Sequence, residues 1–128
     1  MKKILLLLIM LLLTTSCSHS KSNSLENVGL LCKGKDGIYD KDGKRVVEST
    51  YSNIINNNQM KYSNLTLPCK STEDSIQCQI YEDNLSHSVN INRFTLQVHH
   101  SYVIGTISGG GYNGLFDGVC VIKEKEQI

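Results

Sequence analysis

The chain contains no tryptophan, one proline and almost no excess of either charge. Because proline cannot donate to a strand ladder, its scarcity leaves nearly every segment free to form a β-strand. Without Lys2 and Lys3, which belong to the leader described below, 11 basic residues face 12 acidic ones. So balanced a surface has no field that attracts nucleic acid or anionic lipid. We therefore expect no nucleic-acid partner.

The sequence also lacks the short patterns of common catalytic and metal sites. It has no GxSxG nucleophile elbow and no CxxC pair. Asp36, Asp40 and Asp42 lie near glycines, but Lys44 takes the next ligand position of a calcium loop. We therefore interpret these aspartates as turn residues. No catalytic residue, metal or cofactor is expected, and the protein is predicted not to be an enzyme.

The histidines give no recognisable metal site either. His99 and His100 are adjacent in a predicted strand, so their side chains point to opposite faces and are poorly placed to bind one ion. We interpret them as a surface or rim pair. His87 is expected in a turn, where no nearby cysteine or carboxylate completes a ligand set.

The N-terminus has the layout of a secretory signal. A short basic start is followed by ten apolar residues, Ile4–Leu13, and then by the small polar residues Thr14–Ser16. A run of ten is well short of the roughly 20 residues that a membrane-spanning helix needs. The sequence predicts a signal peptide over residues 1–16, followed directly by Cys17.

The segment Leu13-Thr14-Thr15-Ser16-Cys17 resembles the lipobox of bacterial lipoproteins, although Thr14 stands where that family usually has an aliphatic residue. The resemblance implies acyl chains, palmitate among them, on Cys17, and two or more chains anchor a protein stably to a membrane. Ser18, in place of an aspartate, favours the outer membrane over the inner one. The alternative is an ordinary signal that leaves Cys17 as a free thiol. Residues 17–27 are polar and are predicted to form a flexible tether.

Four further cysteines, an even number, point to disulfides in an exported domain, with zinc as the competing explanation. They are Cys32, Cys69, Cys78 and Cys120. Three pairings are possible. Cys69 alternates with Leu65 and Leu67, and Cys78 alternates with Ile76 and Ile80, so a Cys69–Cys78 bond could bridge a hairpin if the register places them opposite each other. Cys32–Cys120 would then join the first strand to the last.

From about residue 28 the pattern is that of antiparallel β structure, with period-two alternation and turn residues between short segments. We predict a single all-β domain over residues 28–128, a small antiparallel β-sandwich or barrel-like domain held by two disulfides. Asp42-Gly43 predicts a tight hairpin turn. Residues 53–58 are expected to form a loop, Asn92-Arg93 a bulge, and 105–114 a glycine-rich connection.

The C-terminal third resembles small exported or lipid-anchored proteins of Gram-negative bacteria that have no assigned function. The resemblance rests on the segments Val89–Thr95 and Phe116-Asp117-Gly118-Val119-Cys120, and on the early Cys32-Lys33-Gly34. This chain departs from them at Leu96, where they often have glycine. The resemblance implies a fold and two strand-linking cysteines, without an activity.

A second resemblance is to the membrane-bound lipoprotein inhibitors of C-type lysozyme. Those are lipid-anchored β-barrels that insert a Ser-Gly-x-x-Tyr loop into the active site of the enzyme. Ser108, Gly109 and Tyr112 match that string, whereas the tryptophan-containing second motif is missing. Arg93, which could bind a carboxylate of a partner through both nitrogens, is a further candidate contact residue.

Together these patterns favour a non-catalytic envelope lipoprotein that binds or shields something at the membrane surface. Its expected partners are the membrane, through the lipid, and an envelope or secreted protein. One alternative is an inhibitor of a lysozyme-type muramidase, with Ser108 and Tyr112 in contact with the enzyme. The other is a surface component that affects phage or cell-envelope interactions.

Overall fold

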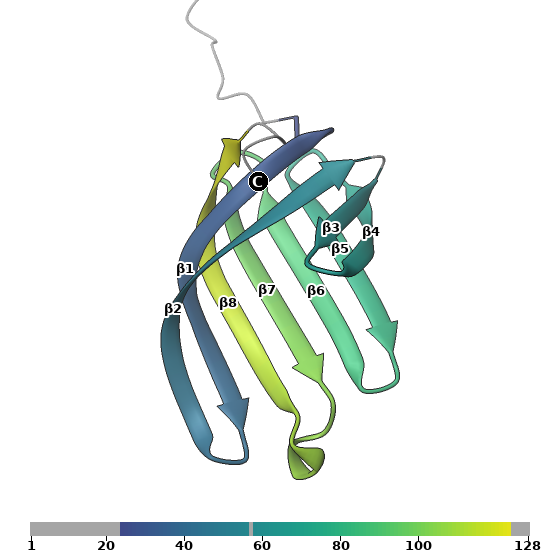
Figure 1. Ribbon diagram of the computed structural model, residues 1–128. Helices are drawn as coiled ribbons and strands as arrows, with labels where there is room; N and C mark the ends of the chain where they lie inside the picture. Colours follow the sequence, from purple (N-terminus) through teal and green to yellow (C-terminus); the bar gives the residue numbers. More distant parts are fainter. Residues whose placement is uncertain (1–23, 57, 124–128) are drawn as a thin grey trace, which may run out of the picture.

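The computed structural model describes residues 24–56 and 58–123, which form a closed antiparallel β-barrel (Figure 1). Each strand pairs with its neighbours in the sequence, and the last strand pairs with the first. The strands are β1 (Val28–Asp40), β2 (Gly43–Asn56), β3 (Gln59–Tyr62), β4 (Leu65–Ser71), β5 (Ser75–Glu82), β6 (Leu85–Asn92), β7 (Gln97–Ile104) and β8 (Tyr112–Lys123). A short 3-10 helix, η1 (Ile107–Gly109), precedes β8. The predicted all-β fold is confirmed, and of its two forms the barrel is the one adopted.

The strands follow the alternation of the sequence, with one face of each strand turned into the barrel. The apolar core lies toward the end where β1 begins and β8 ends (Figure 1). Its buried members come from every strand: Leu30, Cys32, Ile55, Met60, Leu67, Ile76, Cys78, Val89, Ile91, Val98, Phe116 and Cys120. Leu25, which precedes β1, is also buried in this core, with 1% of its surface exposed. The packed domain thus begins inside the segment that we predicted as a tether.

Both predicted disulfides form, each between residues that lie directly opposite on adjacent strands. Cys32 pairs with Cys120 in the β1–β8 register, and Cys69 pairs with Cys78 in the β4–β5 register. We call the first the closing disulfide, because it crosses the seam where the last strand meets the first, and the second the hairpin disulfide. Cys17 lies outside the described residues.

The predicted hairpin between β1 and β2 is confirmed, although its turn is shifted by one residue. Asp40 pairs with Gly43, so the two turn residues are Lys41 and Asp42. The Asp40 carboxylate accepts a hydrogen bond from the Asp42 backbone N–H at 2.9 Å. Gly43 has φ +110°, a conformation that side-chain-bearing residues rarely adopt, which explains the glycine there.

Three local predictions are wrong. Residues 53–56 continue β2 instead of forming a loop, with Ile55 buried. The expected bulge at Asn92-Arg93 is a turn between β6 and β7, in which Asn92 Oδ1 accepts hydrogen bonds from the backbone N–H groups of the next turn residues. This turn accounts for the change of parity in the sequence. The glycine-rich connection ends earlier than expected, because Tyr112 and Gly114 already belong to β8.

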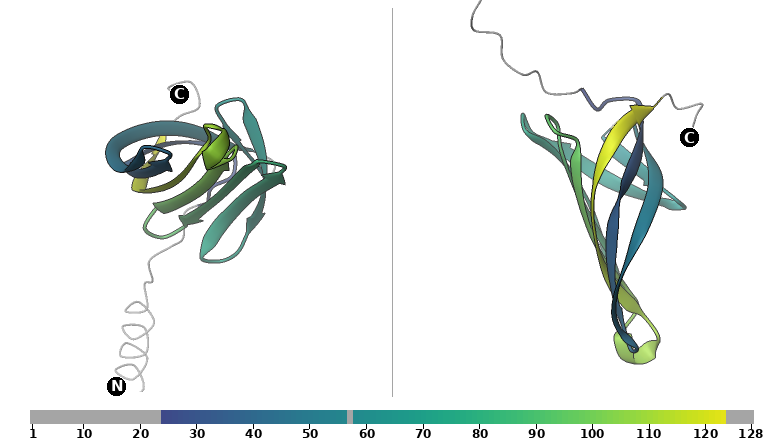
Figure 2. Two further views of the ribbon diagram at one scale, coloured as in Figure 1. Left: turned by 90° about the horizontal axis from the view of Figure 1, so that it is seen from below. Right: turned by 90° about the vertical axis from the view of Figure 1, so that its left-hand side faces the viewer.

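At the opposite end of the barrel from the apolar core lie the β1–β2 turn and the β7–β8 connection with η1 (Figures 1 and 2). Figure 2 shows the barrel from below, with β1, β2 and β8 on one side and β3 to β6 on the other. We call the end with the β1–β2 turn and η1 the mouth of the barrel. Within the described residues, no helix is long and apolar enough to cross a membrane.

Candidate functional site

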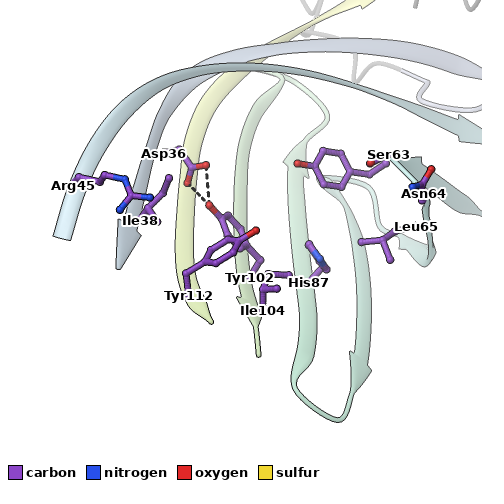
Figure 3. A pocket seen from close by; sticks show the side chains of 11 residues that line it. Asp36, Ile38, Arg45, Ser63, Asn64, Leu65, His87, Tyr102, Ile104 and Tyr112 are labelled. Carbon is purple, nitrogen blue, oxygen red and sulfur yellow. Dashed lines mark hydrogen bonds between the residues drawn. The ribbon is translucent and has the colours of Figure 1, made fainter. Parts of the chain in front are cut away.

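The interior of the barrel changes character toward the mouth, where polar and aromatic side chains replace the aliphatic core. They line a pocket of about 540 Å³, with contributions from β1, β2, β3, β4, β6, β7, β8 and the β3–β4 turn (Figure 3). Every strand except β5 therefore contributes a side chain to one space. A concave site of this size with a few convergent polar groups is typical of ligand pockets.

Asp36 is the acidic group of this pocket. It lies in the middle of β1, and both of its carboxylate oxygens are 2.9 Å from the Tyr102 hydroxyl, which donates to them (Figure 3). Burial, and then this hydrogen bond to a negative group, raise the pKa of Tyr102 above its ordinary value of 10. The interpretation of Asp36 as a turn residue is therefore wrong, whereas Asp40 and Asp42 do lie at the β1–β2 turn.

Gly114 makes room for this arrangement. It lies on the inward face of β8, in register with Tyr102 of β7. A Cβ atom at this position would overlap the Tyr102 ring. The glycine therefore allows the tyrosine to lie across β8 and reach Asp36.

Two buried histidines lie at the pocket: His87 lines it, and His100 contacts His87. His87 of β6 and His100 of β7 are both buried, and their Nδ1 and Nε2 atoms are 2.9 Å apart, so they share one hydrogen bond. Burial lowers the pKa of His100 to about 4 and also lowers that of His87 below its ordinary 6.5. The pair is therefore neutral at physiological pH. The predictions of a turn position for His87 and a surface or rim position for His100 are both wrong; only His99 points outward, where it contacts Asp117.

The remaining ring nitrogen of His87 has no partner. Its Nε2 atom is buried, makes no hydrogen bond to any described residue, and belongs to a side chain that lines the pocket. Buried polar atoms of folded proteins are nearly always hydrogen-bonded, so an exception beside a pocket points to a ligand contact. In either tautomer, this nitrogen offers the pocket an N–H group or a lone pair.

Aromatic rings surround the histidines in a continuous cluster. Tyr62 stacks edge-on against His100 with ring centroids 5.2 Å apart, and Tyr102 lies 6.0 Å from Tyr112. Tyr51 packs edge-on against Phe116 at 4.6 Å and connects the pocket to the apolar core. Edge-to-face contacts of this kind hold the rings in fixed orientations.

The rim of the pocket carries an ion pair. Arg45 of β2 contacts Asp40 at 2.6 Å. The hydrogen bond between them lowers the pKa of Asp40 below 3.8 and raises that of Arg45. Arg45 is thus paired with a carboxylate outside the pocket, and it forms no ion pair with Asp36.

The residues that we predicted to contact a partner do not converge. Tyr112 lines the pocket, whereas Ser108 lies exposed on η1 nearby. Arg93 lies in the β6–β7 turn, at the far end of the barrel from η1, and donates to the Thr72 carbonyl oxygen at 2.5 Å. That contact ties two turns together.

Sequence reasoning missed Asp36, His87 and Tyr102, although a signal was present. His100 and Tyr102 continue the alternation that begins at Val98 of β7, and His87 precedes the buried Val89 by two residues on β6. Extending the period-two pattern through these polar residues places them inside. Within residues 24–56 and 58–123, no three histidine, cysteine or acidic side chains gather closely enough to hold a metal ion.

Comparison with protein-family models, with curated proteins and with solved structures finds no match to this chain.

Proposed function

We propose that this protein is a non-catalytic binding module of the bacterial cell envelope, held at the membrane by lipid on Cys17. The observation that supports binding is the pocket at the mouth, in which a carboxylate, an unpartnered histidine nitrogen and several tyrosines face one space. A barrel of eight strands is just wide enough to be filled by side chains or to hold one small ligand. Here the core end is filled and the mouth is hollow.

The chemistry of the described residues supports binding without catalysis. The two buried histidines hydrogen-bond to each other instead of to a serine or a thiol. All four described cysteines are consumed in disulfides. The hydroxyl of Tyr102 donates to Asp36, and its raised pKa keeps it protonated. None of these groups is arranged as an activated nucleophile with its base.

The two disulfides also support export to an oxidising compartment, because such bonds persist there and are rare in the cytosol. The anchor itself is tested by growing Gram-negative cells that express the full chain with an alkynyl palmitate analogue. We expect label on the protein and none on the Cys17→Ser variant. Equal labelling of both variants would remove Cys17 from the proposal.

Binding at the mouth is tested in the same cells with a photo-crosslinking amino acid at Tyr112. The matched control carries it at Tyr81, an outward tyrosine of β5 with 71% of its surface exposed. We expect a defined adduct from position 112 that position 81 does not form. The same adducts from both positions, or none from position 112, would contradict the proposal.

Inhibition of a lysozyme-type muramidase is the second candidate, favoured by the position of η1. The helix projects at the mouth and exposes Ser108. The loop around it is held in shape, since Gly105 N–H donates to the Asn84 carbonyl at 2.6 Å and Gly111 N–H to the Thr106 carbonyl at 2.6 Å. An ordered, projecting loop suits insertion into an enzyme cleft. Undiminished cell-wall lysis by C-type lysozyme in the presence of excess protein would exclude this candidate.

A further inference from the structure

The chemical class of the ligand rests on the proposed binding function and on the charge of Asp36. In the part of the chain that the structure describes, the carboxylates of Asp40 and Asp117 each have a cationic or ionisable partner. Asp36 has only the neutral hydroxyl of Tyr102, and no lysine, arginine or histidine lies within ion-pair distance of it. Asp36 is partly exposed in the pocket, so a ligand can reach its carboxylate, and a positive charge placed there is attracted to it.

The walls around Asp36 are aromatic. Tyr62, Tyr102 and Tyr112 all line the pocket. The Asp36 carboxylate points toward Tyr102, beside Tyr112 (Figure 3). The faces of tyrosine rings attract cations, and aromatic cages are the usual way in which proteins hold ammonium groups. The negative charge of Asp36 also acts on neighbouring tyrosines, since after burial it is a further cause of the raised pKa of Tyr62 and Tyr102.

The other polar groups of the pocket are compatible with a cation. His87 is buried and neutral, and its Nε2 atom lacks a partner, so it can bond to a ligand without repelling a positive charge. Arg45 is the only arginine or lysine among the lining residues, and it is already paired with Asp40. An anionic ligand would instead meet the uncompensated charge of Asp36.

We propose that the pocket at the mouth binds an organic ammonium group on an apolar stem, with its charge against Asp36 and its stem between Tyr62, Tyr102 and Tyr112. A volume of about 540 Å³ accommodates a group the size of a lysine side chain or a short alkylamine. The ammonium belongs either to a small free amine or to a lysine side chain of a protein, and the chemistry of recognition is the same.

The test uses the full-length protein in non-ionic detergent, titrated with n-butylammonium and followed by NMR of the tyrosine rings. Butyrate and n-butanol have stems of the same length with a negative and a neutral head group, and they serve as matched probes. We expect n-butylammonium to shift the ring signals of Tyr102 and Tyr112 in a saturable way, and the two matched probes to have at least tenfold weaker affinity. Equal or tighter binding of butyrate or butanol would overturn the ammonium assignment.

Two variants locate the site. Asp36→Asn retains the shape of the side chain and a partner for Tyr102, and it should weaken butylammonium binding at least tenfold. Asp117→Asn removes a carboxylate of β8 that lies exposed on the outside of the barrel, and it should leave the affinity unchanged. Tyr112→Leu, at a half-exposed position, should weaken binding several-fold because the aromatic wall beside the ammonium group and its stem is lost. Unchanged affinity in both Asp36→Asn and Tyr112→Leu would overturn the site.

The source of the ammonium is decided by comparing butylammonium and a short diamine with N-acetyl-lysine methylamide. Tighter binding of the lysine derivative assigns the pocket to a protein side chain, and tighter binding of the diamine assigns it to a free amine. Failure of this inference is distinguishable from failure of the proposed function. If the crosslinker at Tyr112 captures a specific adduct while ammonium probes do not bind, the module binds another chemical class. If neither gives a signal, the binding role itself is refuted.

Discussion

Mild acid should destabilise this barrel through its buried histidine pair. His100 has only 2% of its surface exposed, and burial followed by the neighbouring His87 lowers its pKa from 6.5 to about 4. The unfolded chain has histidines of ordinary pKa. Between pH values of about 6.5 and 4, the unfolded state therefore binds a proton that the folded state does not. The free energy of unfolding falls as the pH is lowered through this range.

The size of the effect follows from the difference in pKa. At about pH 5 an unfolded histidine is almost fully protonated, while folded His100 is still almost fully neutral, and one pKa unit corresponds to about 1.4 kcal/mol. The free energy of unfolding should therefore drop by about 2 kcal/mol between about pH 7.5 and pH 5 from His100 alone. His87, whose pKa is also lowered by burial, acts in the same direction. The carboxyl of Asp40 does not interfere, because its lowered pKa lies below 3.8 and its stabilisation is lost only in stronger acid.

Urea unfolding followed by far-UV circular dichroism, with the disulfides intact, measures this difference. In His100→Gln the pH dependence should shrink by about 2 kcal/mol, because the buried titratable ring is gone. His99→Gln is the matched control, since its ring lies on the outer face of the same strand. In this variant the free energy of unfolding should still fall between about pH 7.5 and pH 5, as in the wild-type protein. The reasoning is refuted if the wild-type protein is equally stable at both pH values, or if His100→Gln and His99→Gln behave alike.

Three further predictions concern packing and disulfide cross-links, and they are also measured by urea unfolding. Gly114→Ala should cost about 1–3 kcal/mol, because its Cβ overlaps the Tyr102 ring, and the bond from Tyr102 to Asp36 should be lost from NMR spectra. Gly37→Ala, whose Cβ would meet its nearest neighbour at an ordinary 3.7 Å, should be within about 0.5 kcal/mol of wild type. Replacing both cysteines of the closing disulfide by alanine should cost about 2 kcal/mol more than the same change in the hairpin disulfide, because the sequence separations are 88 and 9; equal costs would contradict the loop-entropy argument. Leu25→Ala should cost about 2–5 kcal/mol although it precedes β1, whereas a cost near zero would show that the segment before β1 is not part of the folded core.

Local features of this fold were predictable from the sequence because they depend on near neighbours. The alternation around Cys69 and Cys78 placed both thiols on the apolar faces of adjacent strands, and the β4–β5 register then puts them opposite each other. The β1–β2 hairpin was likewise visible in its turn residues. The errors at residues 53–58 and 92–93 arose where asparagines are common. Asparagine favours turns, yet Asn53 and Asn56 continue β2, whereas Asn92 does accept the hydrogen bonds of a turn.

The sequence by itself determined that this chain forms antiparallel strands, which side chains share a face, and which cysteines could pair. The cysteines predicted contact between the first strand and the last, but only the tertiary structure decided that β8 hydrogen-bonds along β1 and closes the barrel, because strand alternation carries no information about which distant edge completes a sheet. That closure creates the pocket. Asp36 and Tyr102 lie 66 residues apart in the chain and meet only across the closed barrel. Their bond, and the burial that neutralises His87 and His100, are properties of the enclosed space and belong to no single strand.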